Sequence, residues 1–181
     1  MIKVTSIVYK PLSTASDPDD RYVRVPVEVA NLVAGYGIDG DRKGGNPNRN
    51  LNLVSFETLQ ALQEEGFSTL PGQMGEQIVI RGLDVGKLSE GDRLQIGEQA
   101  CVELVNHRTG CSRFERIQDK SRQLAAGRMG VMAKVITGGR VAVGDPVRLL
   151  TGTQLRENAV HFQVENIPAG GVDTGVLRIS C

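Results

Sequence analysis

The apolar residues of this chain come in short runs that alternate with polar residues and are separated by turns rich in glycine. Valine occupies every second position between residues 23 and 29, and apolar residues alternate again at 100–106, a period typical of strands with one buried face. Aromatic residues make up only 4% of the sequence, so the core must be built from valine, isoleucine and leucine, which favour strands. Further strands are predicted at 2–9, 78–80, 131–137 and 140–143. The sequence therefore predicts a mainly β fold with a few helices.

One domain is expected over residues 1–150, because 181 residues are enough to bury a single substantial core. The Gly138-Gly139 pair is typical of a hairpin turn between the last two predicted strands. Residues 151–181 alternate again in two places and are interpreted as a C-terminal extension. A terminal β-hairpin packed on the domain and a mobile tail both fit this pattern.

Two helices are predicted, at 56–65 and at about 112–126. Ser55 precedes the first helix as an N-cap, and the apolar residues that follow recur on one helical face. In the second helix, Ser112 and Glu115 have the spacing of a capping box. The second helix is thus expected to begin one residue after a cysteine, Cys111.

Charge and composition exclude several classes of protein. The chain has 21 basic and 21 acidic residues, whereas a general nucleic-acid binder usually carries a clear basic excess. It has no run of about 18 apolar residues that could span a membrane, and its first residues lack a signal-peptide pattern, so a cytoplasmic location is expected. Two distant histidines and the absence of a CxxC pair argue against a structural zinc site.

Cys111 is the candidate for covalent or metal chemistry. Between His107 and Arg128 the chain carries six basic and two acidic side chains, although its overall charge is zero. A thiol near a helix start and several cations should ionise more readily than an ordinary one, whose pKa is about 8.5. Two functions remain open for such a thiolate, sulfur transfer through a persulfide and ligation of a soft metal. The alternative is a buried, inert cysteine, as most intracellular cysteines are.

A second candidate feature is the loop at residues 35–50. Its five glycines permit unusual backbone conformations, and it carries Arg42, Lys43 and Arg49. Such a loop can surround an anion with backbone N–H groups and cationic side chains. An ordinary surface loop would have the same composition, and this stretch taken alone favours that interpretation.

Taken in order, the motifs of this chain resemble the MOSC domain, which is named for the C-terminal region of molybdenum-cofactor sulfurases. The resemblance extends from about residue 23 to 150 and rests on the order and spacing of several short motifs. These lie at 37–45, Arg49, Glu57, 71–76, 82–84, 91–97, 108–111, 130–135 and 144–147.

The resemblance implies a closed β-barrel that binds molybdenum cofactor (molybdopterin). It further implies that Cys111 either ligates molybdenum in the reduction of N-hydroxylated compounds or accepts persulfide sulfur. The local cations suit the anionic phosphate of the pterin. The cofactor site is accordingly predicted to include Asp41, Arg42, Lys43, Arg49, Gly75, Glu76, His107, Arg108 and Arg113.

The chain also departs from the family pattern. Lys43 stands where the family usually has histidine, and Met74 and Gln77 stand where phenylalanine and asparagine are common. The sequence contains no pyridoxal-phosphate desulfurase region and no cysteine set for an iron–sulfur cluster. We therefore expect a cysteine desulfurase or an electron-donor protein as partner. The alternative is a non-catalytic sulfur carrier or scaffold that keeps the barrel without redox chemistry.

Overall fold

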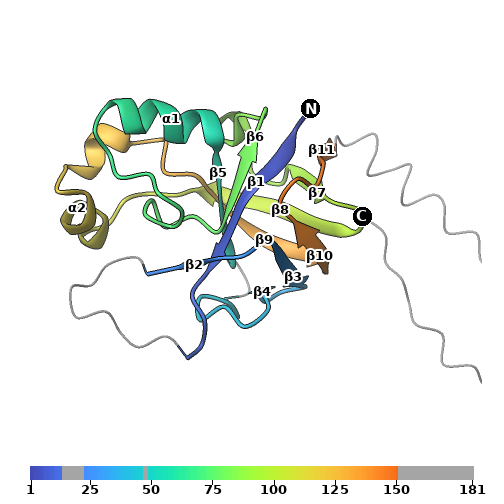
Figure 1. The fold of residues 1–181 in the computed structure, drawn as a ribbon. Coiled ribbons are helices and arrows are strands. Elements are labelled where there is room, and N and C mark those ends of the chain that lie inside the picture. Colours follow the sequence, from blue (N-terminus) through green and yellow to red (C-terminus); the bar gives the residue numbers. More distant parts are fainter. Residues whose placement is uncertain (14–22, 47–48, 151–181) are drawn as a thin grey trace, which may run out of the picture.

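The computed structural model of the protein describes residues 1–13, 23–46 and 49–150. Within them, the larger sheet has eight strands, and all neighbouring strands are antiparallel except β5 and β6 (Figure 1). Its order is β11 (Val147–Leu150), β7 (Arg93–Ile96), β8 (Ala100–His107), β9 (Val131–Thr137), β5 (Leu51–Ser55), β6 (Ile78–Arg81), β1 (Lys3–Tyr9) and β2 (Val25–Pro26). The smaller sheet has the order β10 (Gly139–Ala142), β3 (Val29–Val33) and β4 (Gly37–Ile38). The prediction of a mainly β fold with a few helices is confirmed.

The larger sheet is a curled half-barrel, and the predicted closed barrel is wrong for the described residues. The start of β1 and the segment before β11 approach each other, and the Val147 N–H donates to the Ile2 carbonyl at 3.0 Å. Their pairing is an isolated bridge between Lys3 and Pro146 rather than a ladder. Pro146 has no N–H to donate, which limits the pairing that could form there.

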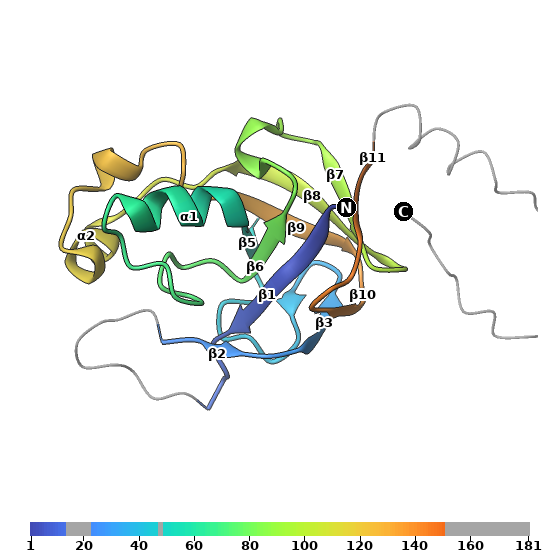
Figure 2. The ribbon, with the colours of Figure 1, turned by 45° about the horizontal axis from the view of Figure 1, so that its top comes forward.

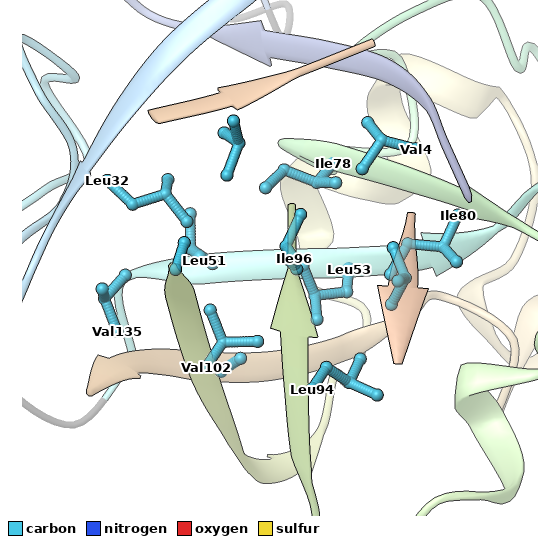
Figure 3. Packing of buried hydrophobic residues seen from close by; sticks show 14 of the residues in the cluster. Val4, Leu32, Leu51, Leu53, Ile78, Ile80, Leu94, Ile96, Val102 and Val135 are labelled. Carbon is cyan, nitrogen blue, oxygen red and sulfur yellow. The ribbon is translucent and has the colours of Figure 1, made fainter. Parts of the chain in front are cut away.

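The core lies between the two sheets and is aliphatic, as predicted. The buried members of this cluster are valine, isoleucine, leucine and alanine residues. A second buried cluster, between the larger sheet and the helices, also contains phenylalanine and methionine. Figure 3 shows Leu51 and Leu53 of β5 meeting Ile96 of β7 and Leu32 of β3 across this interior. Burial of so many branched side chains supplies the main driving force for the fold.

The helices cover the other side of the larger sheet, away from the smaller sheet (Figures 1 and 2). Helix α1 (Phe56–Glu64) matches the helix predicted at 56–65. Ser55 is its N-cap residue, but the Ser55 hydroxyl accepts the backbone N–H of Val85 at 2.8 Å instead of capping the helix. Val85 opens the short 3₁₀ helix η1 (Val85–Lys87), so this hydroxyl ties η1 to the end of β5.

The second helix is shorter than predicted. Helix α2 (Ser112–Gln118) stops at Asp119, which adopts a left-handed conformation with φ of 48°. A separate 3₁₀ helix, η2 (Arg122–Ala125), follows. The predicted capping box is wrong, because Cys111 is the N-cap residue and the Glu115 carboxylate instead accepts the backbone N–H of Arg122 at 3.1 Å.

The predicted hairpin at Gly138 does not form. Strand β10 leaves β9 and pairs with β3, with Arg140 opposite Asn31. A side chain at Gly138 would lie 2.6 Å from the Leu32 carbonyl oxygen, so glycine permits this close passage between the sheets. The C-terminal extension predicted at 151–181 lies outside the described residues. Within those residues, no helix has the length and apolar character needed to cross a bilayer.

Candidate functional site

A polar pocket of about 340 Å³ opens where β5 and β9 meet the loops predicted to carry function. Its walls come from five separate parts of the chain. The lining residues are Arg24, Lys43, Asn46, Arg49, Asn50, Asn52, Gly75, Gln77, Arg108, Cys111, Arg113 and Met132. Among the described residues, this lining contains five cationic side chains and no carboxylate, so it suits an anionic ligand.

The structure brings six of the ten predicted site residues to this pocket. They are Lys43, Arg49, Gly75, Arg108, Cys111 and Arg113. Asp41 and Glu76 are buried behind it, whereas Arg42 and His107 are exposed outside its lining. The loop at 35–50 and the segment around Cys111 therefore form two walls of one pocket.

Cys111 is exposed and follows the end of β8 by four residues. Its backbone is extended, with φ of −125° and ψ of 173°, and α2 begins at the next residue. A side chain at Gly110 would lie 2.6 Å from Cβ of Arg122, so the preceding turn packs closely against η2. Because the Cys111 side chain is exposed, the alternative of a buried cysteine at this position is excluded.

Arg108 connects the Cys111 segment to the turn at 71–77. Its guanidinium donates to the Met74 carbonyl, and its backbone N–H donates to the Gly130 carbonyl at 2.9 Å. A Cβ added to Gly75 would lie 2.7 Å from the Arg108 guanidinium, and Gly75 has φ of +81°. Glycine at this position thus leaves room for the arginine beside the pocket.

Asp41 lies buried behind the pocket and forms hydrogen bonds with two residues of the pocket lining. Its carboxylate is fully buried and accepts the backbone N–H groups of Lys10, at 3.2 Å, and Lys43, at 2.9 Å. Its second oxygen accepts the Gln77 amide at 3.2 Å. Asp41 therefore fixes two pocket residues in place, whereas the sequence predicted that it contacts the cofactor.

Asn52 supplies a buried acceptor in the pocket wall. Its side-chain amide donates to the carbonyls of Gly75, at 3.4 Å, and Met129, at 3.3 Å. Its oxygen Oδ1 has no donor among the described residues, although Asn52 is only 2% exposed. A buried acceptor without a donor is costly unless a ligand or water satisfies it.

The surroundings of Lys43 disfavour the charged form of its side chain. Loss of solvent lowers the pKa of Lys43, and repulsion from Arg113, Arg24 and Lys10 lowers it further, while Asp41 partly offsets these effects. An anion in the pocket would relieve this repulsion.

Glu76 is 1% exposed, and one of its carboxylate oxygens accepts the Gly72 backbone N–H at 2.5 Å. The other oxygen, Oε2, has no hydrogen-bond donor among the described residues. Burial raises the pKa of Glu76, although the Gly72 hydrogen bond and the charges of Arg24 and Arg108 oppose this effect. Glu76 is therefore a buried group whose ionisation costs stability.

Replacing Glu76 with glutamine should raise the free energy of unfolding at pH 7, by about 1 kcal/mol, the scale expected for one poorly solvated buried group. A raised folded-state pKa means that protonation favours the native state, so the Glu76 contribution is complete below pH 4.5 and is lost as pH rises through the folded pKa. Urea unfolding from pH 4 to 8 should show the two stabilities converging at low pH. Glu64→Gln, at an exposed position of α1, should show no such divergence, and a Glu76→Gln protein less stable than the parent at pH 7 would contradict the assignment.

Several pocket residues were missed from the sequence. Asn52 lies between the buried Leu51 and Leu53 of β5, and an amide side chain within a fully buried strand could have indicated a site. Arg24 alternates with valines and resembles any outward residue of an edge strand. Its proximity to Gly75, whose carbonyl accepts its guanidinium at 3.2 Å, depends on the folded chain.

Comparison with known proteins identifies the family to which this fold belongs. The sequence model of the MOSC domain family matches residues 40–148. No curated protein sequence matches the chain.

Three solved structures are similar in fold. The YuaD protein from Bacillus subtilis is 18% identical, with a TM-score of 0.64 over 81% of this chain and 94% of that one. YiiM from Geobacillus stearothermophilus is 17% identical, with a TM-score of 0.64 over 89% and 85% of the two chains. YiiM from Escherichia coli is 22% identical, with a TM-score of 0.60 over 82% and 70%.

Proposed function

Because the chain belongs to the MOSC domain family, we propose that its pocket binds molybdenum cofactor, with Cys111 as a ligand of the metal or as an acceptor of persulfide sulfur. One observation carries the proposal. The exposed Cys111 lies in the same pocket as five cationic side chains contributed by distant parts of the described chain. A thiolate suits a soft metal, and the cations suit the phosphate of a pterin.

The residues present fit this cofactor in charge, size and hydrogen bonding. The pocket volume of about 340 Å³ lies within the ~300–1,000 Å³ usual for small-molecule sites. The N–H groups of a pterin ring are donors of the kind that the buried Oδ1 of Asn52 lacks. The described residues contain no cluster of three or more His, Cys, Asp or Glu side chains that could hold a metal. A metal beside Cys111 would therefore depend on ligands from the cofactor itself.

When bound, the cofactor would supply a metal centre for two-electron reduction, for which we propose N-hydroxylated compounds as substrates. The protein would supply charge and position. Arg108, held by the carbonyl of Met74, and Lys43, held by Asp41, would orient the anionic end of the ligand. Among the described residues, the lining of the pocket contains no histidine that could act as a base for hydrolysis at Cys111. Electrons or sulfur would come from an electron-donor protein or a cysteine desulfurase.

Metal and pterin analysis of the protein purified from a cofactor-producing host would test this proposal. The protein should carry molybdenum and pterin in near-equal amounts. Cys111→Ala should lose more than about nine-tenths of the molybdenum, because a direct ligand is removed. Ser112→Ala, at the neighbouring exposed position, should retain the metal.

The result also separates the proposal from a non-catalytic scaffold. Protein with no molybdenum, no pterin and no persulfide on Cys111 after exposure to a cysteine desulfurase would contradict both roles of Cys111. The scaffold alternative would then stand.

A further inference from the structure

The pocket combines a sulfur nucleophile with an anion site. Cys111 is exposed, and Lys43, Arg49 and Arg108 line the same pocket from the opposite loop and from the end of β8. A thiol that received sulfur only from a partner protein would need exposure but no surrounding anion site. Besides the phosphate of a pterin, the same cations can recognise a small, charged sulfur donor.

The electrostatics of Lys43 point independently to an anion. Three neighbouring cations repel it, and Asp41 offsets this only in part. The Asp41 carboxylate is also buried and bonded to backbone N–H groups of Lys10 and Lys43, so it cannot enter the pocket. A dianion in the pocket would restore the balance of charge.

The size of the pocket limits which anions can enter. A volume of about 340 Å³ holds a small molecule, and the zero net charge of the whole chain gives no long-range attraction for a polyanion. The combination of a thiol and clustered cations in this space suits a donor whose leaving group is itself an oxyanion.

We propose that Cys111 takes sulfur directly from small dianionic sulfane-sulfur donors, of which thiosulfate is the simplest. The inference rests on the persulfide-acceptor role within the proposed function and names its substrate class. The Cys111 thiolate attacks the outer sulfur of thiosulfate, and a new S–S bond forms on the cysteine. The S–S bond of thiosulfate breaks with its electron pair passing to the leaving sulfite dianion. The product is a Cys111 persulfide, and the pocket cations stabilise both the entering and the leaving dianion.

The test uses the full chain without cofactor. After incubation with thiosulfate, mass spectrometry should find one added sulfur atom on Cys111, with one sulfite released per protein. With cyanide as acceptor, thiocyanate should form over many turnovers. Cys111→Ser should show none of these, and absence of sulfur addition in the parent protein would overturn the proposal.

Charge-removing variants test the role of the pocket. Lys43→Met and Arg49→Met should each lower kcat/KM for thiosulfate by roughly 10- to 100-fold, the scale of one charge-assisted contact. Alkylation of Cys111 by the neutral reagent iodoacetamide should change less than about twofold, because that reagent makes no use of the cations. Arg140→Met, an equal charge change at an exposed position of β10, should leave both rates unchanged.

The outcomes separate this inference from the proposed function. If a cysteine desulfurase loads Cys111 with persulfide but thiosulfate does not, the donor class is wrong and the acceptor role stands. If thiosulfate reacts equally well in Lys43→Met and Arg49→Met, recognition by the cations is overturned. Molybdenum content is measured on separate samples, so its absence contradicts only the cofactor proposal.

Discussion

Replacing Gly130 with alanine is expected to lower the free energy of unfolding by roughly 3–5 kcal/mol, since backbone strain and overpacking each cost about 1–3 kcal/mol. Gly130 has φ of +98°, a conformation that residues with a side chain rarely adopt. A Cβ there would lie 2.5 Å from the Leu53 carbonyl oxygen and 2.6 Å from Oδ1 of Asn52. Because β5 lies between β6 and β9, its backbone cannot move aside easily. Urea unfolding followed by circular dichroism measures the loss.

Gly144→Ala is the matched control. Gly144 has a similar φ of +94°, but within the described part of the chain no atom lies within 4 Å of an added Cβ. Its substitution should cost only about 1–2 kcal/mol, the usual penalty for a left-handed backbone. Equal losses in the two variants would show that contact with β5 contributes nothing at Gly130.

Replacing Asp41 with alanine is expected to cost roughly 2–4 kcal/mol, because a buried donor left without an acceptor costs about 1–3 kcal/mol and a partly buried donor costs less. Three donors lose their acceptor, namely the backbone N–H groups of Lys10 and Lys43 and the side-chain amide of Gln77. The pocket should weaken with the fold, because Lys43 and Gln77 both line it. Thermal unfolding and cofactor content, measured on the same samples, test the two effects.

Two further variants show whether Asp41 is structural. Asp41→Asn keeps one acceptor oxygen and should fall between the parent and Asp41→Ala. Asp84→Ala removes an exposed carboxylate that accepts the Gly86 N–H at the start of η1 and forms an exposed ion pair with Lys87. The substitution should cost about 1 kcal/mol or less. Loss of cofactor from Asp41→Ala without loss of stability would instead support the direct cofactor contact predicted from the sequence.

Local structure was predictable wherever the signal was itself local. The apolar alternation at 100–106 corresponds to β8, and the strand predicted at 131–137 coincides with β9. The pairing of β10 with β3 was not predictable, because strand partners depend on contacts between distant residues. The end of α2 depends on the left-handed backbone of Asp119, which a run of helix-favouring residues did not indicate.

In the candidate site, too, residues were predictable where the signal was local and not where it depended on distant contacts. Cys111 and its neighbouring cations could be recognised from charge and spacing, and Lys43 from its glycine-rich loop. Asp41 and Glu76 were expected in the site because they belong to motifs that resemble the MOSC domain. Asp41 is instead held behind the pocket by a hydrogen bond from the distant Lys10 backbone, and Glu76 is buried while it accepts the Gly72 N–H.

The isolated bridge between Lys3 and Pro146 is expected to open more readily than the strand ladders of the larger sheet. Local opening in proteins starts where few hydrogen bonds must break, and the half-barrel offers such places at β2, β11 and this bridge. Strands β5 and β9, which carry Asn52 and Met132 of the pocket, occupy the middle of the sheet order. Fraying at β11 can therefore occur while β5 and β9 stay paired, whereas fraying of β2 would also displace the adjacent Arg24 from the pocket wall.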